Sequence, residues 1–222
     1  MYSRRWTVRW TIAVTVMTLA GAAFTISLIG VAQERSTTPT TVPRVESFDH
    51  LNGPRIELPE DFQGESPMRE LCPEEGSDTC RKYWAYTGNF VRNNTIPDRD
   101  RELLILRTAW LSRGDYIWGR HNLIGQDVGL TEEEILRVTA GPDAPGWNNF
   151  ETALLRAADE LHMSRFVSDA TWTSLAQRYT QDELVEVVLI VGNYTQLSMF
   201  QNTLGAQLGP DIEGLPDATT TR

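Results

Sequence analysis

Lysine is almost missing from this sequence of 222 residues, in which Lys82 is the only example. The other basic residues are arginines, and 30 acidic residues leave a formal net charge of −10 at pH 7. Proteins that bind nucleic acid through electrostatics present a basic stripe or patch, and this sequence contains no such pattern. We therefore expect neither a nucleic-acid partner nor lysine Schiff-base chemistry.

Cysteine is also scarce: Cys72 and Cys80 are the only two, and they enclose the segment PEEGSDT. Catalytic dithiols usually lie much closer together at the start of a helix, where the helix dipole stabilises the thiolate. The wider spacing here is more typical of a structural disulfide, which forms in an oxidising compartment. We predict a Cys72–Cys80 disulfide ahead of the first helix of the folded domain, with a redox-active pair as the alternative.

One long apolar run is present near the N-terminus. Residues 11–32 contain no charge and are numerous enough to cross a hydrocarbon core of roughly 30 Å. Three arginines precede this run, so the positive-inside rule places residues 1–10 in the cytoplasm and the rest of the chain in the periplasm or outside the cell. A cleaved signal peptide is the alternative, but the run exceeds the usual signal core of about 7–15 residues. We predict a single-pass membrane anchor.

Composition divides the remainder of the chain into three parts. Residues 33–66 are rich in threonine, proline and charge and lack apolar periodicity, which predicts a flexible linker. Residues 67–208 carry a helical pattern and are predicted to form the folded domain. The polar residues 209–222 are predicted to form a disordered tail.

Apolar residues in the domain recur with helical spacing, and no alternating strand pattern occurs. Two capping boxes mark helix starts, because Thr131 and Thr180 are each followed three residues later by a glutamate that can bond the capping amide. The predicted fold class is therefore all-α. The expected helix ranges are 97–113, 115–128, one starting at 131, 148–161, 168–178 and 181–207.

The helix expected at 97–113 is apolar on nearly every side of its centre, which indicates a helix buried all round. Glu102 shares a face with Ile105 and Leu106 and is expected to point inward, and Arg107 is enclosed by apolar neighbours. Buried charges need partners because an unpaired one is strongly destabilising. These two residues are consistent both with a structural ion-pair network and with a functional site.

His121 belongs to the inward stripe of the next helix, together with Ile117 and Ile124. A lone histidine in such a stripe is more often a packed core residue than a catalyst. However, an antiparallel hairpin of the two helices brings the face that carries Glu102 towards His121, and a buried carboxylate beside an imidazole can form a proton relay. Glu102 and His121 are therefore the candidate catalytic pair.

Four segments, in this order, resemble the carboxymuconolactone decarboxylase family, whose fold is shared with alkylhydroperoxidase D. They are RELLILRTAW, RGDYIWGRHNLIGQDVGLTEEEI, GPDAPGWNNFETALLRAADELH and VGNYTQLSMFQNTLGAQL, within residues 97–208. The resemblance implies an alkylhydroperoxidase D-like helical bundle. In the redox branch of the family, a glutamate on one helix precedes a Cys-x-x-Cys-x-x-x-His run on the next, and Glu102 and His121 occupy the glutamate and histidine positions.

The two cysteine positions of that run fall on Gly114 and Ile117. Neither residue can supply the thiolate that attacks a peroxide or a disulfide, which excludes thiol peroxidase activity by the family mechanism. The branch without these cysteines implies acid–base chemistry on a lactone or carboxylate substrate, with no cofactor and no metal ion.

The leading interpretation is a membrane-anchored enzyme in which Glu102 and His121 move protons and Arg107 holds a substrate carboxylate. The residues expected to line the substrate pocket are Tyr116, Trp118 and Tyr194. Relatives imply a homo-oligomer, either a trimer or a hexamer. A non-catalytic oligomeric binding protein of the same fold, and a redox protein that uses its two cysteines, are the alternatives.

Overall fold

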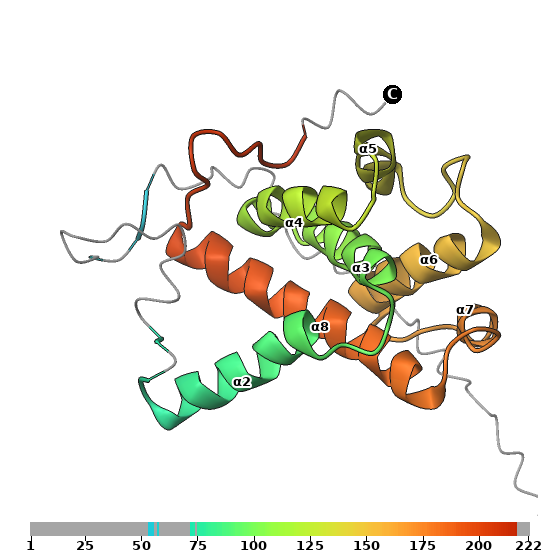
Figure 1. Cartoon of the computed structure of the whole chain (residues 1–222), viewed down its shortest axis with the longest axis horizontal. Helices are drawn as coiled ribbons and strands as arrows, with labels where there is room; N and C mark the ends of the chain where they lie inside the picture. The colour runs from blue at the N-terminus through green and yellow to red at the C-terminus, as the bar shows by residue number, and fades with distance from the viewer. Residues whose placement is uncertain (1–52, 56, 58–71, 74, 217–222) are drawn as a thin grey trace, which may run out of the picture. The chain divides into compact units, whose positions relative to one another are not determined.

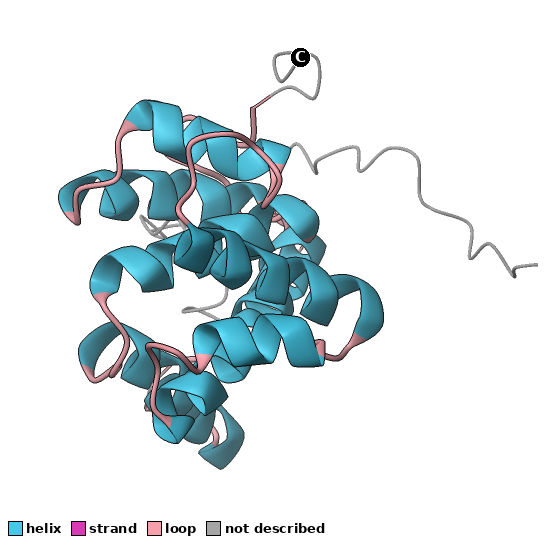
Figure 2. Ribbon diagram, turned by 90° about the vertical axis from the view of Figure 1, so that its right-hand side faces the viewer, coloured by secondary structure: helices cyan, strands magenta, loops and turns pink. Residues whose placement is uncertain are grey.

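The computed structural model describes residues 53–55, 57, 72–73 and 75–216, all within one compact unit of the chain that spans residues 47–222. Over these residues the fold is all-α, as predicted, with seven helices and no strand (Figure 2). In chain order the helices are α2 (Asp78–Arg92), α3 (Asp98–Leu111), α4 (Asp115–Asp127), α5 (Glu132–Ala140), α6 (Asn149–Ser164), α7 (Asp169–Leu175) and α8 (Gln181–Leu204).

The predicted capping boxes are confirmed at the starts of α5 and α8. The Thr131 hydroxyl accepts from the Glu134 amide while the Glu134 carboxylate accepts from the Thr131 amide, and Thr180 and Glu183 form the same pair of bonds. Asn148 and Glu151 make a third capping box at the start of α6. Each box satisfies amides that the helix itself leaves free.

α3 is the central helix of the bundle and packs against α4, α5, α6 and α8 (Figure 1). Ten consecutive residues, Asp100 to Ala109, are buried on it. Because leucine and isoleucine occupy every side at 103–106, all four neighbouring helices can bury apolar area against it. Any polar group on α3 must consequently find its partner inside the protein.

α2 is fastened at its N-terminal end by a disulfide between Cys72 and Cys80. Cys80 lies in the first turn of α2, a helix that was not among the expected ranges, and the indole N–H of Trp84 donates to the carbonyl of Cys72. Further along, the Thr87 hydroxyl donates to Asn193 on α8 at 3.0 Å. α2 is thus held by one covalent link and by a polar contact with α8.

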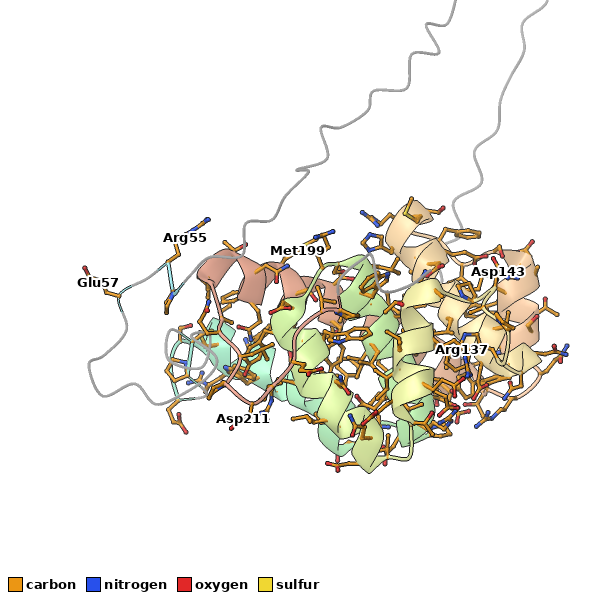
Figure 3. The ribbon with its side chains drawn as sticks, turned by 90° about the horizontal axis from the view of Figure 1, so that it is seen from above. Arg55, Glu57, Arg137, Asp143, Met199 and Asp211 are labelled. Carbon is orange, nitrogen blue, oxygen red and sulfur yellow. A yellow bond between two sulfur atoms is a disulfide. The ribbon has the colours of Figure 1, made fainter. Side chains whose placement is uncertain are left out.

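Residues 205–216, here named the C-terminal segment, follow α8 and pass over α4 (Figure 3, where Asp211 is labelled). The Leu215 amide donates to the Asp115 carboxylate at 2.8 Å, and the Leu215 side chain packs against the core. On the N-terminal side of the domain, the Arg55 amide donates to the carbonyl of Leu204 at 2.9 Å. Both segments therefore bind near the C-terminal end of α8.

Several predictions fall on residues that the structure does not describe. They are the cytoplasmic N-terminus at 1–10, the membrane helix at 11–32, most of the linker at 33–66 and the last part of the tail, 217–222. Within the part of the chain that is described, no helix is long and apolar enough to span a bilayer.

Candidate functional site

Glu102 and His121 lie side by side in the centre of the bundle. The imidazole Nδ1 of His121, on α4, is 2.6 Å from Oε2 of Glu102, on α3. Glu102 is 1 % exposed, and the His121 side chain retains 10 % of its accessible surface. Because a carboxylate can only accept a hydrogen bond, the short contact places the proton on Nδ1 and points it at Glu102.

The second oxygen of the Glu102 carboxylate is held by Arg101. Arg101 Nε donates to Glu102 Oε1 at 2.9 Å, and its Nη1 donates to Asp98 at 2.6 Å and to Asn94 at 2.9 Å. Arg101 is itself buried, so its charge and that of Glu102 compensate each other within the core. Arg101 was not predicted from the sequence, in which its only signal is its place next to a glutamate expected to point inward.

Tyr194, on α8, packs against the imidazole ring of His121. Its ring meets the His121 ring edge to face, with centroids 4.9 Å apart. Burial, reinforced by the negative charge of Glu102, raises the pKa of Tyr194 well above its usual range. The phenol therefore stays protonated at physiological pH and limits the rotation of His121 without adding a charge.

The other imidazole nitrogen, Nε2, has no hydrogen-bond partner among the described residues. With Nδ1 protonated and bound to Glu102, a neutral imidazole presents its lone pair at Nε2. This is the arrangement of a general base whose tautomer is fixed by a carboxylate. The geometry can accept a proton at Nε2 and stabilise the resulting imidazolium through Glu102.

The first cysteine position of the redox motif, Gly114, is sterically closed. A Cβ atom built on Gly114 would lie 2.3 Å from Oγ and 2.9 Å from Cβ of Ser198 on α8. The second position, Ile117, is a buried apolar side chain in the core. Both thiols of the motif are thus missing, and Ser198 occupies the space that a side chain at position 114 would need.

Arg107 lies apart from this pair, on another face of α3. Its Nε and Nη2 donate to the two oxygens of Asp159 at 2.6 and 2.9 Å, and its Nη1 donates to the carbonyls of Val138 and Thr139. The guanidinium therefore already binds a carboxylate in the two-pronged manner in which it would bind a substrate. Asp159 occupies the place that a substrate carboxylate would need.

The predicted lining residues do not converge on one pocket. Trp118 lines a cavity of about 380 Å³ between α4, α5 and the C-terminal segment. Tyr116 lines a separate cavity of about 60 Å³ beside the end of α8, and Tyr194 packs on His121. Neither cavity is lined by Glu102 or His121.

Comparison with known proteins finds a family match over part of the chain. Residues 78–160, from the first residue of α2 to the later part of α6, match the sequence profile of the carboxymuconolactone decarboxylase family. Glu102 and His121 lie inside the matched region, and Tyr194 lies outside it. A comparison with curated protein sequences gives no match.

Two solved structures share the fold. One is a protein of unknown function from Agrobacterium tumefaciens, proposed to be an antioxidant defence protein AhpD. The two structures superpose with a TM-score of 0.56 at 16 % sequence identity, and the match covers 62 % of this chain and 95 % of that one. The other is the alkylhydroperoxidase AhpD core of an uncharacterised peroxidase-related protein from Ralstonia eutropha JMP134. Here the TM-score is 0.53 at 17 % sequence identity, and the match covers 60 % of this chain and 72 % of that one. Such identities establish the fold alone. Residues 78–160 are therefore similar to the carboxymuconolactone decarboxylase family, and the described part of the chain has an AhpD-like all-α fold.

Proposed function

We propose that this protein is a membrane-anchored, cofactor-independent enzyme that performs acid–base chemistry on a small lactone or carboxylate substrate. The single observation that carries the proposal is the Glu102–His121 contact at 2.6 Å, which fixes the proton on Nδ1 and leaves Nε2 without a protein partner among the described residues. A histidine that served only to fill the core would not need a buried carboxylate to set its tautomer.

In the proposed mechanism, His121 Nε2 takes a proton from the substrate, at a carbon made acidic by a neighbouring carbonyl group. The imidazolium that forms is stabilised by Glu102, whose own charge is balanced by Arg101. His121 then returns the proton at a later step, so the pair ends in its starting state. No electron leaves the substrate, and no thiol is needed, consistent with the glycine and isoleucine at the motif positions.

A non-catalytic binding protein is the second candidate, and one observation favours it. The Glu102–His121 pair is almost fully buried, while the cavity of about 380 Å³ beside α4 is lined by other residues. In that case the pair would serve to join α3 to α4, and a ligand would bind elsewhere. Loss of the pair would then reduce stability and leave binding per folded molecule unchanged.

Replacement of His121 separates these candidates. The full chain is assayed against a panel of lactones, β-keto acids and hydroperoxides, and His121→Ala is expected to lower turnover of the accepted substrate by about 10²–10⁴-fold while retaining the helical circular dichroism spectrum. His162→Ala, which removes a histidine from α6, is the control and should retain turnover. Equal turnover of His121→Ala and the parent chain, corrected for the folded fraction, would contradict the enzyme proposal.

The anchor at residues 11–32 and the placement of the domain outside the cytoplasm belong to the same proposal. A reporter fused after Arg222 should be active only outside the cytoplasm, and the intact chain should stay in the membrane after an alkaline carbonate wash. A mature form that starts near Gln33 would overturn the anchor, and reporter activity in the cytoplasm would overturn the orientation.

We also propose that the domain assembles as a trimer or hexamer through α8. Val185, Val188, Leu189 and Met199 are exposed on this helix, Met199 by 62 % (Figure 3). Exposed apolar residues grouped on one helix are typical of a protein interface. Sedimentation of Val188→Glu should show a smaller assembly than the parent chain if this face joins the subunits; an unchanged sedimentation coefficient would contradict it.

A further inference from the structure

A second candidate site is the cavity of about 380 Å³ between α4, α5 and the C-terminal segment. Its volume falls within the range of small-molecule sites. Trp118 and Gln126 line it from α4, Leu136 lines it from α5, and Glu213 lines it from the C-terminal segment. Because neither Glu102 nor His121 reaches it, the proposed catalytic pair does not explain it.

The C-terminal segment, which forms one wall of this cavity, is held in a defined position on α4. The Leu215 amide is bound to the Asp115 carboxylate, and Gly214 lies so close to Asp115 that an added Cβ would be 2.2 Å from Oδ1. At Gly119 an added Cβ would meet Leu208 at 2.7 Å. Two glycines therefore permit the C-terminal segment to lie directly on α4, which makes the cavity a built feature of the fold.

The cavity is negatively charged. Glu132 and Glu213 line it, neither makes an ion pair with any residue that the structure describes, and none of the lining residues is basic. Gln126 donates its amide N–H to Asn122 and keeps its carbonyl oxygen as an acceptor. A ligand that is a cation and a hydrogen-bond donor suits these groups, since two carboxylates and an amide oxygen can all accept from it.

An anion is disfavoured even though the N-terminus of α5 is close by. Helix N-termini attract anions through their free amides and the helix dipole. The first turn of α5, however, carries three glutamates, and the capping box of Thr131 and Glu134 already binds two of the amides at this end of the helix. The positive end of this helix is thus neutralised within the protein.

The remaining walls are apolar and contain one unused donor. Ile135 is buried, Leu136 is 41 % exposed, and Trp118 is 2 % exposed. The indole N–H of Trp118 has no hydrogen-bond partner in the described part of the chain, although the residue lines the cavity. An acceptor group on a ligand in the cavity can bond this N–H, and the indole ring can also attract a cation.

We propose that this cavity binds a small organic ammonium ion that combines an apolar body with a hydroxyl or similar acceptor group. The ammonium group lies between Glu132 and Glu213, the apolar body lies on Ile135 and Leu136, and the acceptor group meets the Trp118 N–H. The site is independent of the proposed catalytic pair and adds a binding function on the opposite wall of α4.

The proposal is tested with three probes of the same shape and different charge. They are 2-amino-1-phenylethanol, the neutral 1-phenylethane-1,2-diol and the anion mandelate, titrated into the full chain by calorimetry. The expected order of affinity is cation, then neutral diol, then anion, with at least about a tenfold difference between cation and anion, which two exposed ion pairs can supply. Equal or tighter binding of mandelate, or no saturable binding of the cation, would overturn the proposal.

Variants locate the site. Glu132→Gln and Glu213→Gln should each weaken binding of the cation by roughly two- to fivefold, the range for exposed ion pairs. Glu133→Gln is the matched control, because Glu133 lies on the same turn of α5 but is paired with Arg137 and does not line the cavity. Unchanged affinity in the double variant of Glu132 and Glu213 would refute the site.

His121→Ala separates this inference from the proposed enzymatic function. It should abolish turnover and leave the affinity for 2-amino-1-phenylethanol unchanged, because His121 does not line the cavity. Loss of cation binding in this variant, with the domain still folded, would show that the two sites are one and would overturn the independence claimed for the cavity.

Discussion

The two sides of α4 use charge in opposite ways. On the inner side, His121 meets Glu102 and Arg101, and every charge there has a partner within hydrogen-bond distance. On the outer side, Glu132 and Glu213 line an open cavity and make no ion pair with a described residue. Pairing on the inner side is obligatory because an unpaired buried charge is strongly destabilising, whereas carboxylates near water can stay unpaired and attract a ligand.

The largest effect should come from breaking the inner pair. Glu102→Ala removes the acceptor of both His121 and Arg101 and leaves a buried guanidinium with fewer partners. We expect the free energy of unfolding to fall by about 3–5 kcal/mol, measured by denaturant titration of the full chain. Glu133→Ala, on the exposed side, should change it by less than about 0.5 kcal/mol. Similar losses in the two variants would remove the distinction between the sides.

The next effect concerns the closed thiol position at the start of α4. Gly114→Cys forces a side chain into Ser198, which should cost about 1–3 kcal/mol. In a Ser198→Gly background the same substitution should cost much less, so a double-mutant cycle should show a coupling of at least about 1 kcal/mol. Additive costs would mean that Ser198 moves aside freely and does not close the position.

A matched pair of glycines tests the contact between α4 and the C-terminal segment. Gly119→Ala should destabilise the domain by about 1 kcal/mol and increase proteolysis of residues 205–216, because the new Cβ meets Leu208 and the carbonyl of Glu213. Gly192→Ala on α8, where no atom lies within 4 Å of the added Cβ, should stabilise the helix by up to about 1 kcal/mol. Equal effects of both substitutions would contradict a close contact at Gly119.

The smallest effect lies in the ion pairs that join α3 to α5 and α6. Arg99 lowers the pKa of Glu134 to about 2, below its model-compound value of 4.5. A lowered pKa in the folded state means that this stabilisation is present above pH 4.5 and is lost as the pH falls towards 2. Because the Arg99–Glu134 pair is partly exposed and screened by solvent, Glu134→Gln should reduce stability by less than about 1 kcal/mol at neutral pH. The difference in the free energy of unfolding between Glu134→Gln and the parent chain should vanish as the pH falls towards 2. A difference that grew at low pH would show that the Arg99–Glu134 ion pair is not its cause.

The sequence predicted the fold well where the signals are local. Capping boxes at Thr131 and Thr180 and the apolar centre of α3 each depend on residues within one helical turn, so the all-α fold followed from them. Helix ends were less accurate, since they depend on contacts with distant residues. The helix expected to reach residue 113 ends at Leu111, and Arg113 has a positive φ. Gly114 is small because Ser198 approaches it, which no local pattern reveals.

The candidate site was predictable only in part, for the same reason. Helical spacing indicated that Glu102 and His121 face inward on neighbouring helices, and the structure places them 2.6 Å apart. Spacing gives the direction of a side chain but not the element that it meets. Nothing in the sequence indicated that Asp159 lies against Arg107, or that Tyr116 and Trp118 line different cavities.

The two segments that enter and leave the domain determine where a mechanical load would act. Arg55 is bonded to the carbonyl that ends α8, and Leu215 is bonded to Asp115 at the start of α4. Asn202, on the last turn of α8, also donates to the carbonyl of Arg113, so these attachment points share one end of the bundle. A pull on both segments is therefore borne by a few hydrogen bonds at that end, and the Glu102–His121 pair lies outside the path of the force.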